Sequence, residues 1–325
     1  MRCIVTGGAG FLGSHLAESL IVHGNEVVVI DDLFRGRWKN LEMLKGSPGY
    51  WKMKGDACSI EVLKEAAEKL GGVDVIYHLA AINGTKWFHE KANMVVDVNI
   101  RSTIAAIQLA NDEACRLVFT SSPEAFGDNQ EMPLANGMSS VFSSPHLHQR
   151  HSYGASKYLG EILVQHAHRT KDLDTRIIRP FNVYGPRSPG NDYGQVVNIF
   201  LENIIAERQI TIHDEGKQTR SFTWINDAIE GIMLAGTLDR GVDGSLLSGG
   251  AWNIGMPKET SILELAKLIY EICEKEEKII FGKGHPGDSN RRIPDISNAE
   301  TQLGWYPMTE LQQGLESTLR SFQMV

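Results

Sequence analysis

The chain has 325 residues, of which 42% are hydrophobic and 22% charged, enough apolar side chain for one large or two modest folded domains. The 32 Lys and Arg against 40 Asp and Glu give a net charge of −8, which argues against general nucleic-acid binding through phosphate neutralisation. No apolar run is long enough to span a membrane, and we expect neither a signal peptide nor a membrane partner but a cytoplasmic protein. The four cysteines have no spacing typical of disulfides or zinc, and no metal is expected.

Short β-branched runs alternate with amphipathic helical stretches through the first half of the chain. The predicted strands cover residues 3–6, 26–30, 73–79, 116–119 and 176–179, and the predicted helices cover residues 12–23, 60–70, 92–111 and 153–170. Strands that alternate with helices in this way are typical of a parallel sheet covered on both faces. The fold class predicted is therefore a doubly wound α/β sheet.

The remaining chain is less regular. Residues 127–152 lack periodicity and are predicted to be a loop that closes over a site, because long unstructured segments in compact domains are usually functional. After residue 180, clusters of glycine and proline separate helices such as 262–274. This part is expected to form a smaller C-terminal lobe.

A glycine-rich turn lies between the first predicted strand and the first helix, with Gly7, Gly10 and Gly13 three residues apart. In dinucleotide-binding turns, the first glycine makes the turn, the second lets the backbone approach a pyrophosphate, and the third packs the helix on the sheet. At the end of the second strand, Asp31 and Asp32 are placed to accept hydrogen bonds from the adenosine ribose. Since a carboxylate there repels a 2′-phosphate, the cofactor predicted is NAD, although Arg35 and Arg37 nearby weaken that preference.

Further cofactor contacts are predicted from residues at the ends of other strands. Asp56 and Ala57 are placed to seat the adenine, and the backbone after the strand that ends near His78 is placed against the cofactor, whereas His78 itself is expected to be a packed histidine. The full set of additional predicted contacts is Phe11, Leu12, Asp56, Ala57, Leu79, Ala80, Ala81 and Asn99.

Tyr153 and Lys157 lie one helical turn apart and share a helix face. A phenol with a pKa near about 10 acts as a base near neutrality only beside positive charge, which Lys157 and an oxidised nicotinamide both provide. Ser122, at the end of the strand before the long loop, supplies a hydroxyl that can hold the substrate oxygen. These three residues are the best catalytic candidates.

At this point the sequence resembles the extended short-chain dehydrogenase/reductases that act on nucleotide sugars. The resemblance runs in family order over almost the whole chain. It rests on Thr6-Gly7-Gly8-Ala9-Gly10-Phe11-Leu12-Gly13, Asp31-Asp32-Leu33, His78-Leu79-Ala80-Ala81, Thr120-Ser121-Ser122, Tyr153-x-x-x-Lys157, Arg179-Pro180-Phe181-Asn182-Val183-Tyr184-Gly185-Pro186-Arg187, Gln218-Thr219-Arg220-Ser221-Phe222-Thr223 and Leu303-Gly304-Trp305-Tyr306-Pro307.

The resemblance implies a bound NAD that oxidises C4 of a sugar held by its nucleotide diphosphate. By position, Tyr153 is the base, Lys157 orients it and the nicotinamide ribose, and Ser122 holds the C4 oxygen. The implied substrate-binding residues are Asn182 at the phosphates and Arg220 and Arg291 at the diphosphate or its ribose, with Arg292 as a substitute for Arg291. Lys86 lies in a stretch outside the resemblance and is a candidate to face the sugar and set specificity for an anionic group. As the alternative, either arginine pairs with a local carboxylate such as Asp288 or Asp295, and Lys86 is solvated.

The resemblance leaves three outcomes open after the oxidation: hydride returned to the opposite face gives a 4-epimer, loss of water a 4-keto-6-deoxy sugar, and loss of a carboxylate a pentose. Glu124 resembles the glutamate that dehydratases and decarboxylases often carry two residues after the serine, yet Pro123 stands where one class of dehydratases has an aspartic acid. Residues 194–220 resemble nucleotide-sugar decarboxylases and residues 83–88 do not. We expect an epimerase, with a 4,6-dehydratase using Glu124 as the C5 base or a decarboxylase as alternatives, and a non-catalytic NAD-binding regulator as a minor one.

Two further expectations follow from the family. Residues 1–180 are expected to form an NAD-binding Rossmann domain, and residues 181–325 mainly a nucleotide-sugar-binding lobe, with part of the chain returning to the first domain. Family members commonly form homodimers by packing the helices over 92–111 and from 153 onward, and Ile100, Ile104 and Ile107 form a compatible stripe. The nucleotide is expected to be uridine diphosphate.

Overall fold

A seven-stranded sheet forms the larger part of the molecule. The computed structural model describes residues 1–190, 195–283 and 289–323. Every neighbouring pair in the large sheet is parallel, and the strand order is β11-β6-β5-β4-β1-β2-β3. Its strands are β1 (Arg2–Thr6), β2 (Glu26–Asp31), β3 (Tyr50–Lys54), β4 (Val75–His78), β5 (Arg116–Thr120), β6 (Thr175–Pro180) and β11 (Ala251–Ile254). The predicted doubly wound α/β fold is confirmed.

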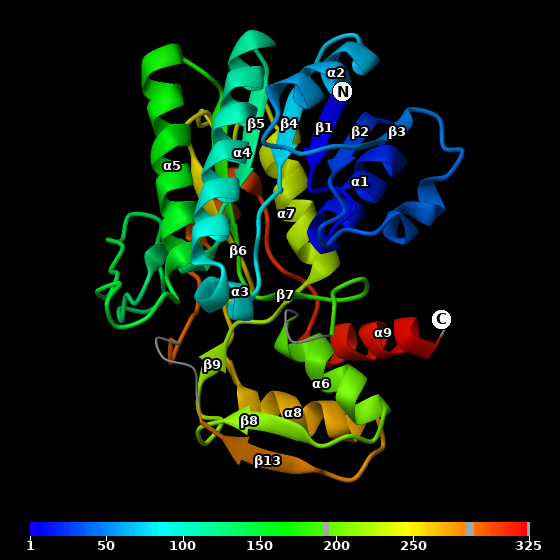
Figure 1. Ribbon diagram of the computed structural model, residues 1–325, viewed down its shortest axis with the longest axis vertical. Helices are drawn as coiled ribbons and strands as arrows, with labels where there is room; N and C mark the ends of the chain where they lie inside the picture. The colour runs from blue at the N-terminus through cyan, green and yellow to red at the C-terminus, as the bar shows by residue number, and fades with distance from the viewer. Residues whose placement is uncertain (191–194, 284–288, 324–325) are drawn as a thin grey trace.

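Helices cover both faces of this sheet (Figure 1). Along β1, Cys3 and Val5 belong to one apolar core and Ile4 to the other, because successive side chains of a strand point to opposite faces. Contacts place α2, α4 and α5 on the Ile4 side and α1 and α7 on the other. These helices are α1 (Phe11–Val22), α2 (Ile60–Leu70), α4 (Ala92–Asp112), α5 (Ser152–Lys171) and α7 (Ile225–Thr237).

The smaller lobe lies at the opposite end of the view in Figure 1 and combines short strand pairs with helices. It contains α6 (Val196–Ile205), β8 (Ile210–His213), β9 (Thr219–Arg220), β12 (Thr260–Ser261), α8 (Ile262–Ile272), β13 (Ile279–Gly282) and α9 (Leu311–Gln323). Between the lobes run β7 (Val183–Tyr184) and β10 (Thr223–Trp224), and the remaining elements are η1 (Trp38–Leu44), α3 (Thr85–Glu90), η2 (Pro123–Phe126) and η3 (Ala299–Leu303). Since β11 and α7 belong to the large sheet and its cover, the chain after residue 180 returns to the first lobe.

The segment 127–152, predicted as a closing loop, is held by two isolated bridges, and its last residue, Ser152, begins α5. Gly127 forms a bridge with Val141, and Leu134 forms one with Pro294. The Leu134 amide donates to the Ile293 carbonyl at 2.8 Å, and the Asp295 amide donates to the Leu134 carbonyl at 2.9 Å. The segment is therefore tied to the C-terminal part of the chain.

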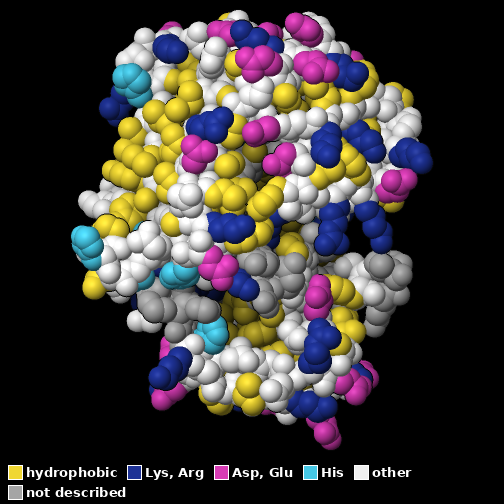
Figure 2. All heavy atoms as spheres, viewed as in Figure 1, with side chains coloured by type: hydrophobic (Ala, Val, Ile, Leu, Met, Phe, Trp, Pro, Cys, Tyr) yellow, Lys and Arg dark blue, Asp and Glu magenta, His cyan; other side chains and the backbone are white. Residues whose placement is uncertain are grey.

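Exposed apolar side chains gather over α4 and α5. Figure 2 shows hydrophobic side chains concentrated on this side of the molecule. Large side chains that are exposed there are Ile104 on α4 and Tyr158, Leu159 and Ile162 on α5. Within the described residues, no helix combines the length and the apolar character needed to cross a lipid bilayer.

Candidate active site

The strand order reverses between β1 and β4, which opens a crevice at the carboxyl ends of these strands. Gly7 follows β1 with a φ of +66°, and a Cβ there would lie 2.9 Å from the Ala80 backbone. A Cβ on Gly13 would lie 2.3 Å from the Gly7 carbonyl. Both positions therefore require glycine, one for its backbone conformation and the other for close packing of α1.

The first turn of α1 is suited to a phosphate group. Its N-cap, Gly10, makes no side-chain capping bond, and the first turn carries no acidic residue. The amide groups and the helix dipole at such an end attract anions. Phe11 and Leu12, both half-buried, begin this turn. The glycine turn thus fits the pyrophosphate of a dinucleotide.

Asp31 organises the loop after β2. Its carboxylate accepts hydrogen bonds from the Ala9 amide at 2.9 Å and the Leu33 amide at 2.8 Å. Burial raises the pKa of Asp31, and the two amides oppose that rise. Asp32 is exposed and accepts from the Phe34 amide at 2.9 Å. The carboxylates lie at the expected edge of the sheet, and their contact with ribose remains a prediction.

The other predicted adenine contacts follow β3. Asp56 is exposed and accepts a hydrogen bond from the Cys58 amide at 2.8 Å, and Ala57 is buried. The carboxylate therefore shapes its own turn and stays accessible, and its role toward adenine also remains a prediction.

The segment after β4 is anchored by Asn99 of α4. The Asn99 side chain accepts from the Ile82 amide at 2.7 Å and donates to the Ser156 hydroxyl at 2.9 Å. Leu79, Ala80 and Ala81 lie half-buried just before this anchor. Asn99 thus joins the segment after β4 to α5, and a contact between its side chain and NAD stays a prediction.

His78 is packed inside the protein. Its Nδ1 lies 2.8 Å from the Thr6 hydroxyl, and burial together with the Lys157 charge lowers its pKa to about 3. The imidazole is neutral near pH 7, which agrees with a structural histidine.

The candidate catalytic residues meet where η2 contacts the beginning of α5. A Cβ on Gly154 would lie 2.3 Å from the Glu124 carbonyl, so the glycine after Tyr153 allows this close approach. Ser122 caps η2 by accepting from the Glu124 amide at 3.2 Å, and its side chain is hydrogen-bonded with Tyr153. The ring of Tyr153 stacks on Phe88 of α3 with centroids 5.1 Å apart. The structure thus brings Ser122, Glu124 and Tyr153 together.

Lys157 lies one turn further along α5. Its ammonium donates to the Thr120 carbonyl at 2.7 Å and lies 5.8 Å from the Tyr153 ring centroid. Burial lowers the pKa of Lys157 to about 7, while the Glu161 charge raises it. Burial also raises the pKa of Tyr153, whereas the Ser122 hydrogen bond and the Arg35 charge lower it. Without bound groups, the phenol is protonated at neutral pH.

Glu124 is enclosed by two guanidinium groups. Arg150 contacts both carboxylate oxygens, at 3.2 Å and 3.1 Å, and Arg292 contacts Oε2 at 3.3 Å. Arg292 also donates to the Pro123 carbonyl at 2.8 Å and the Gly127 carbonyl at 3.1 Å. Burial would raise the pKa of Glu124, but the Arg150 and Arg292 charges outweigh it and lower the pKa to about 2. We call Glu124, Arg150 and Arg292 the front cluster.

Arg150 is absent from the residues predicted from sequence. Its position three residues before Tyr153, at the end of the irregular segment, could have identified it as a candidate site residue. Arg292 was predicted only as a substitute for Arg291, and the structure buries the side chain of Arg292 while leaving that of Arg291 56% exposed.

The predicted substrate-binding residues occupy different surroundings. Arg291 pairs with Glu259, with Nη2 and Oε2 2.6 Å apart. Asn182 donates to the Ser221 carbonyl at 3.0 Å, and the Arg220 charge acts on Glu124 from the side of the small lobe. Lys86 is exposed on α3. Arg220 is thus near the front cluster, whereas Arg291 pairs with Glu259, a carboxylate other than the Asp288 and Asp295 named in the alternative. Substrate binding by these residues stays a prediction. Asp288 and Gly194, the latter at the start of the decarboxylase-like segment, lie outside the described residues.

A second buried acid lies behind the site. Glu161 accepts from Arg179 at 2.7 Å and 2.6 Å and from the Ser121 hydroxyl at 2.5 Å. Arg179 also donates to the Asn136 side chain at 3.0 Å. We call Ser121, Glu161, Arg179 and Asn136 the back cluster. It fixes β5, α5 and β6 relative to one another.

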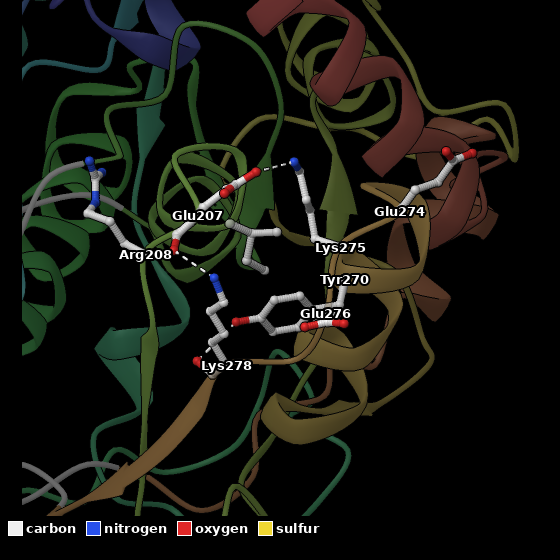
Figure 3. A pocket seen from close by; sticks show the side chains of 8 residues that line it. Glu207, Arg208, Tyr270, Glu274, Lys275, Glu276 and Lys278 are labelled. Atoms are coloured by element: carbon white, nitrogen blue, oxygen red, sulfur yellow. Dashed lines mark hydrogen bonds and ion pairs between the residues drawn. The ribbon is translucent and has the colours of Figure 1, made fainter.

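Two hollows lie away from these clusters. One of about 250 Å³ is in the small lobe, where Lys275 and Glu207 point toward one another and pair at 2.6 Å (Figure 3). Another of about 460 Å³ lies near the amino ends of the central strands, lined by residues such as Asp74, Arg116 and Asp174. In the described part of the chain, no group of three His, Cys, Asp or Glu side chains is arranged to hold a metal ion.

Comparison with known proteins agrees with this geometry. Residues 3–255 match the model of the NAD dependent epimerase/dehydratase family, and the chain belongs to that family. It is an enzyme of this family with NAD as its cofactor, as the glycine turn and the acidic strand end indicate.

Three relatives illustrate the range of the family. UDP-glucuronic acid decarboxylase 1 of Arabidopsis thaliana is 34% identical over 323 residues, which cover 99% of this chain and 70% of the relative. UDP-N-acetyl-alpha-D-glucosaminuronate decarboxylase of Bacillus cytotoxicus is 31% identical over 332 aligned residues, covering 100% of this chain and 98% of the relative. The crystal structure of the UDP-glucose 4-epimerase of Thermotoga maritima with UDP-glucose has a TM-score of 0.90 at 26% identity, covering 100% of this chain and 99% of that one.

Proposed function

We propose that the protein removes carbon dioxide from a UDP-linked uronic acid, that is, a nucleotide sugar whose C6 is a carboxylate. The observation that carries the proposal is the front cluster, in which two buried guanidinium groups meet one carboxylate beside Ser122 and Tyr153. The two decarboxylase relatives support it, and they favour this alternative over the epimerase expected from sequence.

The charges of the front cluster suit an anionic sugar. Arg150 and Arg292 carry two positive charges, and ionised Glu124 carries one negative charge, so the cluster has one net positive charge. Buried unbalanced charge is costly, and a substrate carboxylate nearby balances it. Guanidinium groups also match a carboxylate geometrically, through paired N–H donors. A neutral sugar provides no such balance.

Tyr153, Lys157 and Ser122 carry out the proton chemistry at C4. NAD, when bound, accepts a hydride from C4 and later returns it. Tyr153 takes the C4 hydroxyl proton, and the hydroxyl of Ser122 holds the same oxygen. Lys157, fixed on the Thr120 carbonyl, places positive charge near the phenol. Its pKa of about 7 in a buried setting means that a bound anion nearby favours its charged form.

The 4-keto sugar is then a β-keto acid. The C5–C6 bond breaks, its electrons move into the C4 carbonyl to give an enolate, and the carboxylate leaves as carbon dioxide. Ser122 and Tyr153 stabilise the enolate oxygen, a proton from solvent adds to C5, and Tyr153 returns its proton to the C4 oxygen as the hydroxyl is restored. No base has to remove a proton from C5.

Dehydration is less compatible with this chemistry. It needs a base at C5 and an acid at the departing C6 oxygen. Glu124 has a pKa of about 2 and is therefore a weak base, and Pro123 has no acidic group. The low pKa follows from the two arginines, so the feature that suits an anionic substrate also makes Glu124 a poor C5 base. A 4-epimerase remains the second candidate, on the likeness to the UDP-glucose 4-epimerase.

We further propose that the nucleotide diphosphate lies between the lobes. Arg220 supplies positive charge from the small lobe, and Asn182, between the lobes, has a φ of +35° that turns its backbone at the start of β7. In this arrangement residues 1–180 bind NAD, and residues 181–325 mainly hold the nucleotide sugar. Arg292, through Glu124, links the sugar site to the C-terminal segment.

The test is incubation of the purified enzyme with UDP-glucuronic acid, UDP-N-acetylglucosaminuronic acid and UDP-glucose, with products followed by mass spectrometry and NMR. We expect carbon dioxide and a UDP-pentose or its N-acetylated counterpart from one of the acids and no reaction of UDP-glucose. Loss of water from UDP-glucose, or its conversion at unchanged mass, would overturn the proposal in favour of a dehydratase or an epimerase. Tyr153→Phe, with its fold confirmed by circular dichroism, identifies any contaminating activity.

We also propose a homodimer formed by α4 and α5. Ile104 and Leu159 are 48% and 44% exposed in the apolar region over these helices, and burial of such side chains favours association. Ile104→Arg and Leu159→Arg should each give monomers in light scattering coupled to size exclusion. Ile280→Arg on β13 is a matched control, because Ile280 is a similarly exposed isoleucine on the other lobe. A wild-type monomer at micromolar concentration would contradict the dimer.

A further inference from the structure

Arg35 has no role in the chemistry above, although it reaches across the cofactor crevice. It lies in the loop after β2, which is tied down on both sides. A Cβ on Gly36 would lie 2.5 Å from an Asp31 carboxylate oxygen, so the loop folds back on Asp31. The Arg37 amide donates to the Ala9 carbonyl at 3.0 Å, within the glycine turn. The backbone that carries Arg35 is therefore fixed beside the turn that fits a pyrophosphate.

The side chain of Arg35 extends to the other side of the crevice. Its Nη1 donates to the Asn83 carbonyl, and its guanidinium lies over the Trp87 ring, 5.3 Å from the centroid. The neighbouring Phe34 ring lies 4.9 Å from that of Trp87. Asn83 and Trp87 belong to the segment after β4 and to α3, so the two walls of the crevice meet through these side chains.

Arg35 also lies close enough to the catalytic phenol for their charges to interact. The Arg35 charge lowers the pKa of Tyr153, while burial lowers the pKa of Arg35 and Tyr153 opposes that shift. Arg35 therefore has its backbone beside the glycine turn and its guanidinium on the side of the crevice that carries Asn83 and Trp87, within reach of the Tyr153 charge.

We propose that Arg35 and Trp87 form a bridge over the cofactor crevice, in which the Arg35 guanidinium binds the NAD pyrophosphate and retains the cofactor. Guanidinium groups hold phosphate oxygens through paired hydrogen bonds and stack on aromatic rings. Trp87 orients the guanidinium by stacking, and the Asn83 carbonyl occupies one of its donors. This role depends on NAD binding and not on which sugar the enzyme converts.

The experiment compares ligands that differ in their phosphates. Wild type and the variants Arg35→Gln and Arg35→Lys are freed of NAD, and their affinities for NAD, ADP-ribose and adenosine are measured by calorimetry. Arg35→Gln should weaken NAD and ADP-ribose by about tenfold or more, since a hydrogen bond to a charged group is lost, and should leave adenosine unchanged. Arg35→Lys should recover part of the loss, and Trp87→Leu should weaken the same two ligands to a smaller extent.

Arg37→Gln is the matched control, because Arg37 is exposed in the same loop and the variant removes the same charge. It should bind all three ligands as wild type does. If Arg35→Gln weakens adenosine as much as NAD, Arg35 only shapes the loop, and the proposal fails. It also fails if Arg35→Gln binds NAD normally or if Arg37→Gln matches its loss.

Discussion

The front and back clusters both place arginine beside a buried glutamate, but the number of arginines differs between them. In the back cluster, the carboxylate oxygens of Glu161 accept hydrogen bonds from Arg179 and Ser121. Both of these partners are buried. In the front cluster, Glu124 meets two arginines, which leaves one net positive charge beside Tyr153. The back cluster thus joins structural elements through a balanced pair, whereas the front cluster carries the unbalanced charge on which the proposed binding of an acidic sugar rests.

The largest expected effect is on catalysis at the front cluster. Arg292→Lys keeps the charge but cannot reach Glu124, Pro123 and Gly127 together, so turnover of the uronic acid should fall about 10²- to 10³-fold. Steady-state kinetics with folded protein measures this. Arg291→Lys, at the adjacent exposed position, is the control and should stay near wild type. Equal losses in the two variants would mean that the buried position of Arg292 has no special role.

The next effect is on stability at the back cluster. Arg179→Met leaves Glu161 buried without its bidentate partner, and loss of one partner of a buried pair costs about 3–5 kcal/mol. Urea unfolding should show this loss in the free energy of unfolding. Turnover per folded molecule should fall far less than in Arg292→Lys. If Arg179→Met instead keeps its stability and loses its activity, the distinction between the two clusters is wrong.

The stability that Glu124 of the front cluster contributes to the fold should depend on pH. The pKa of Glu124 is about 2 in the folded protein and near its ordinary value of 4.5 when unfolded, so its ionised form stabilises the fold above the unfolded value. This contribution, up to about 3 kcal/mol, is lost as pH falls from about 4.5 toward 2. The difference in unfolding free energy between wild type and Glu124→Gln should therefore shrink over that range. A difference independent of pH would show that Glu124 is not held ionised.

The smallest effect is expected at the exposed pair in the small lobe. Arg291→Ala should change kcat and KM by less than about twofold, since exposed ion pairs contribute little. Arg220→Ala, whose charge acts on Glu124, should raise KM for the nucleotide sugar more than Arg291→Ala does. A larger increase in KM for Arg291→Ala would restore the role that its sequence position implied.

The sequence predicted five of the seven strands of the large sheet because each of them depends on a local pattern, whereas β3 and β11 were given no predicted bounds. The helix over 60–70 has the predicted bounds, and α5 begins one residue before the predicted start at Tyr153. The glycine turn was recognised because its constraints lie within seven residues: the φ of Gly7 and the packing of Gly13. Local geometry of this kind is encoded in local sequence.

The front cluster could not be predicted in the same way. Glu124 is 26 residues from Arg150 and 168 from Arg292, and no periodicity records such contacts. The choice between Arg291 and Arg292 depends on which of the two neighbouring side chains points into the protein. The backbone hydrogen bonds of Leu134 with Ile293 and Asp295 fix the chain next to Arg292. The ionisation of Glu124, on which the proposed preference among reactions rests, follows from these distant partners.

The bond between Arg292 and the Pro123 carbonyl spans 169 residues, and this separation has a consequence during synthesis on the ribosome. The glycine turn, Asp31, Tyr153 and Lys157 all leave the ribosome well before Arg292, so the dinucleotide half is complete while Glu124 still lacks one of its cations. Glu124 therefore gains the second guanidinium group of the front cluster late in synthesis, long after Arg150, the first one, has joined the chain.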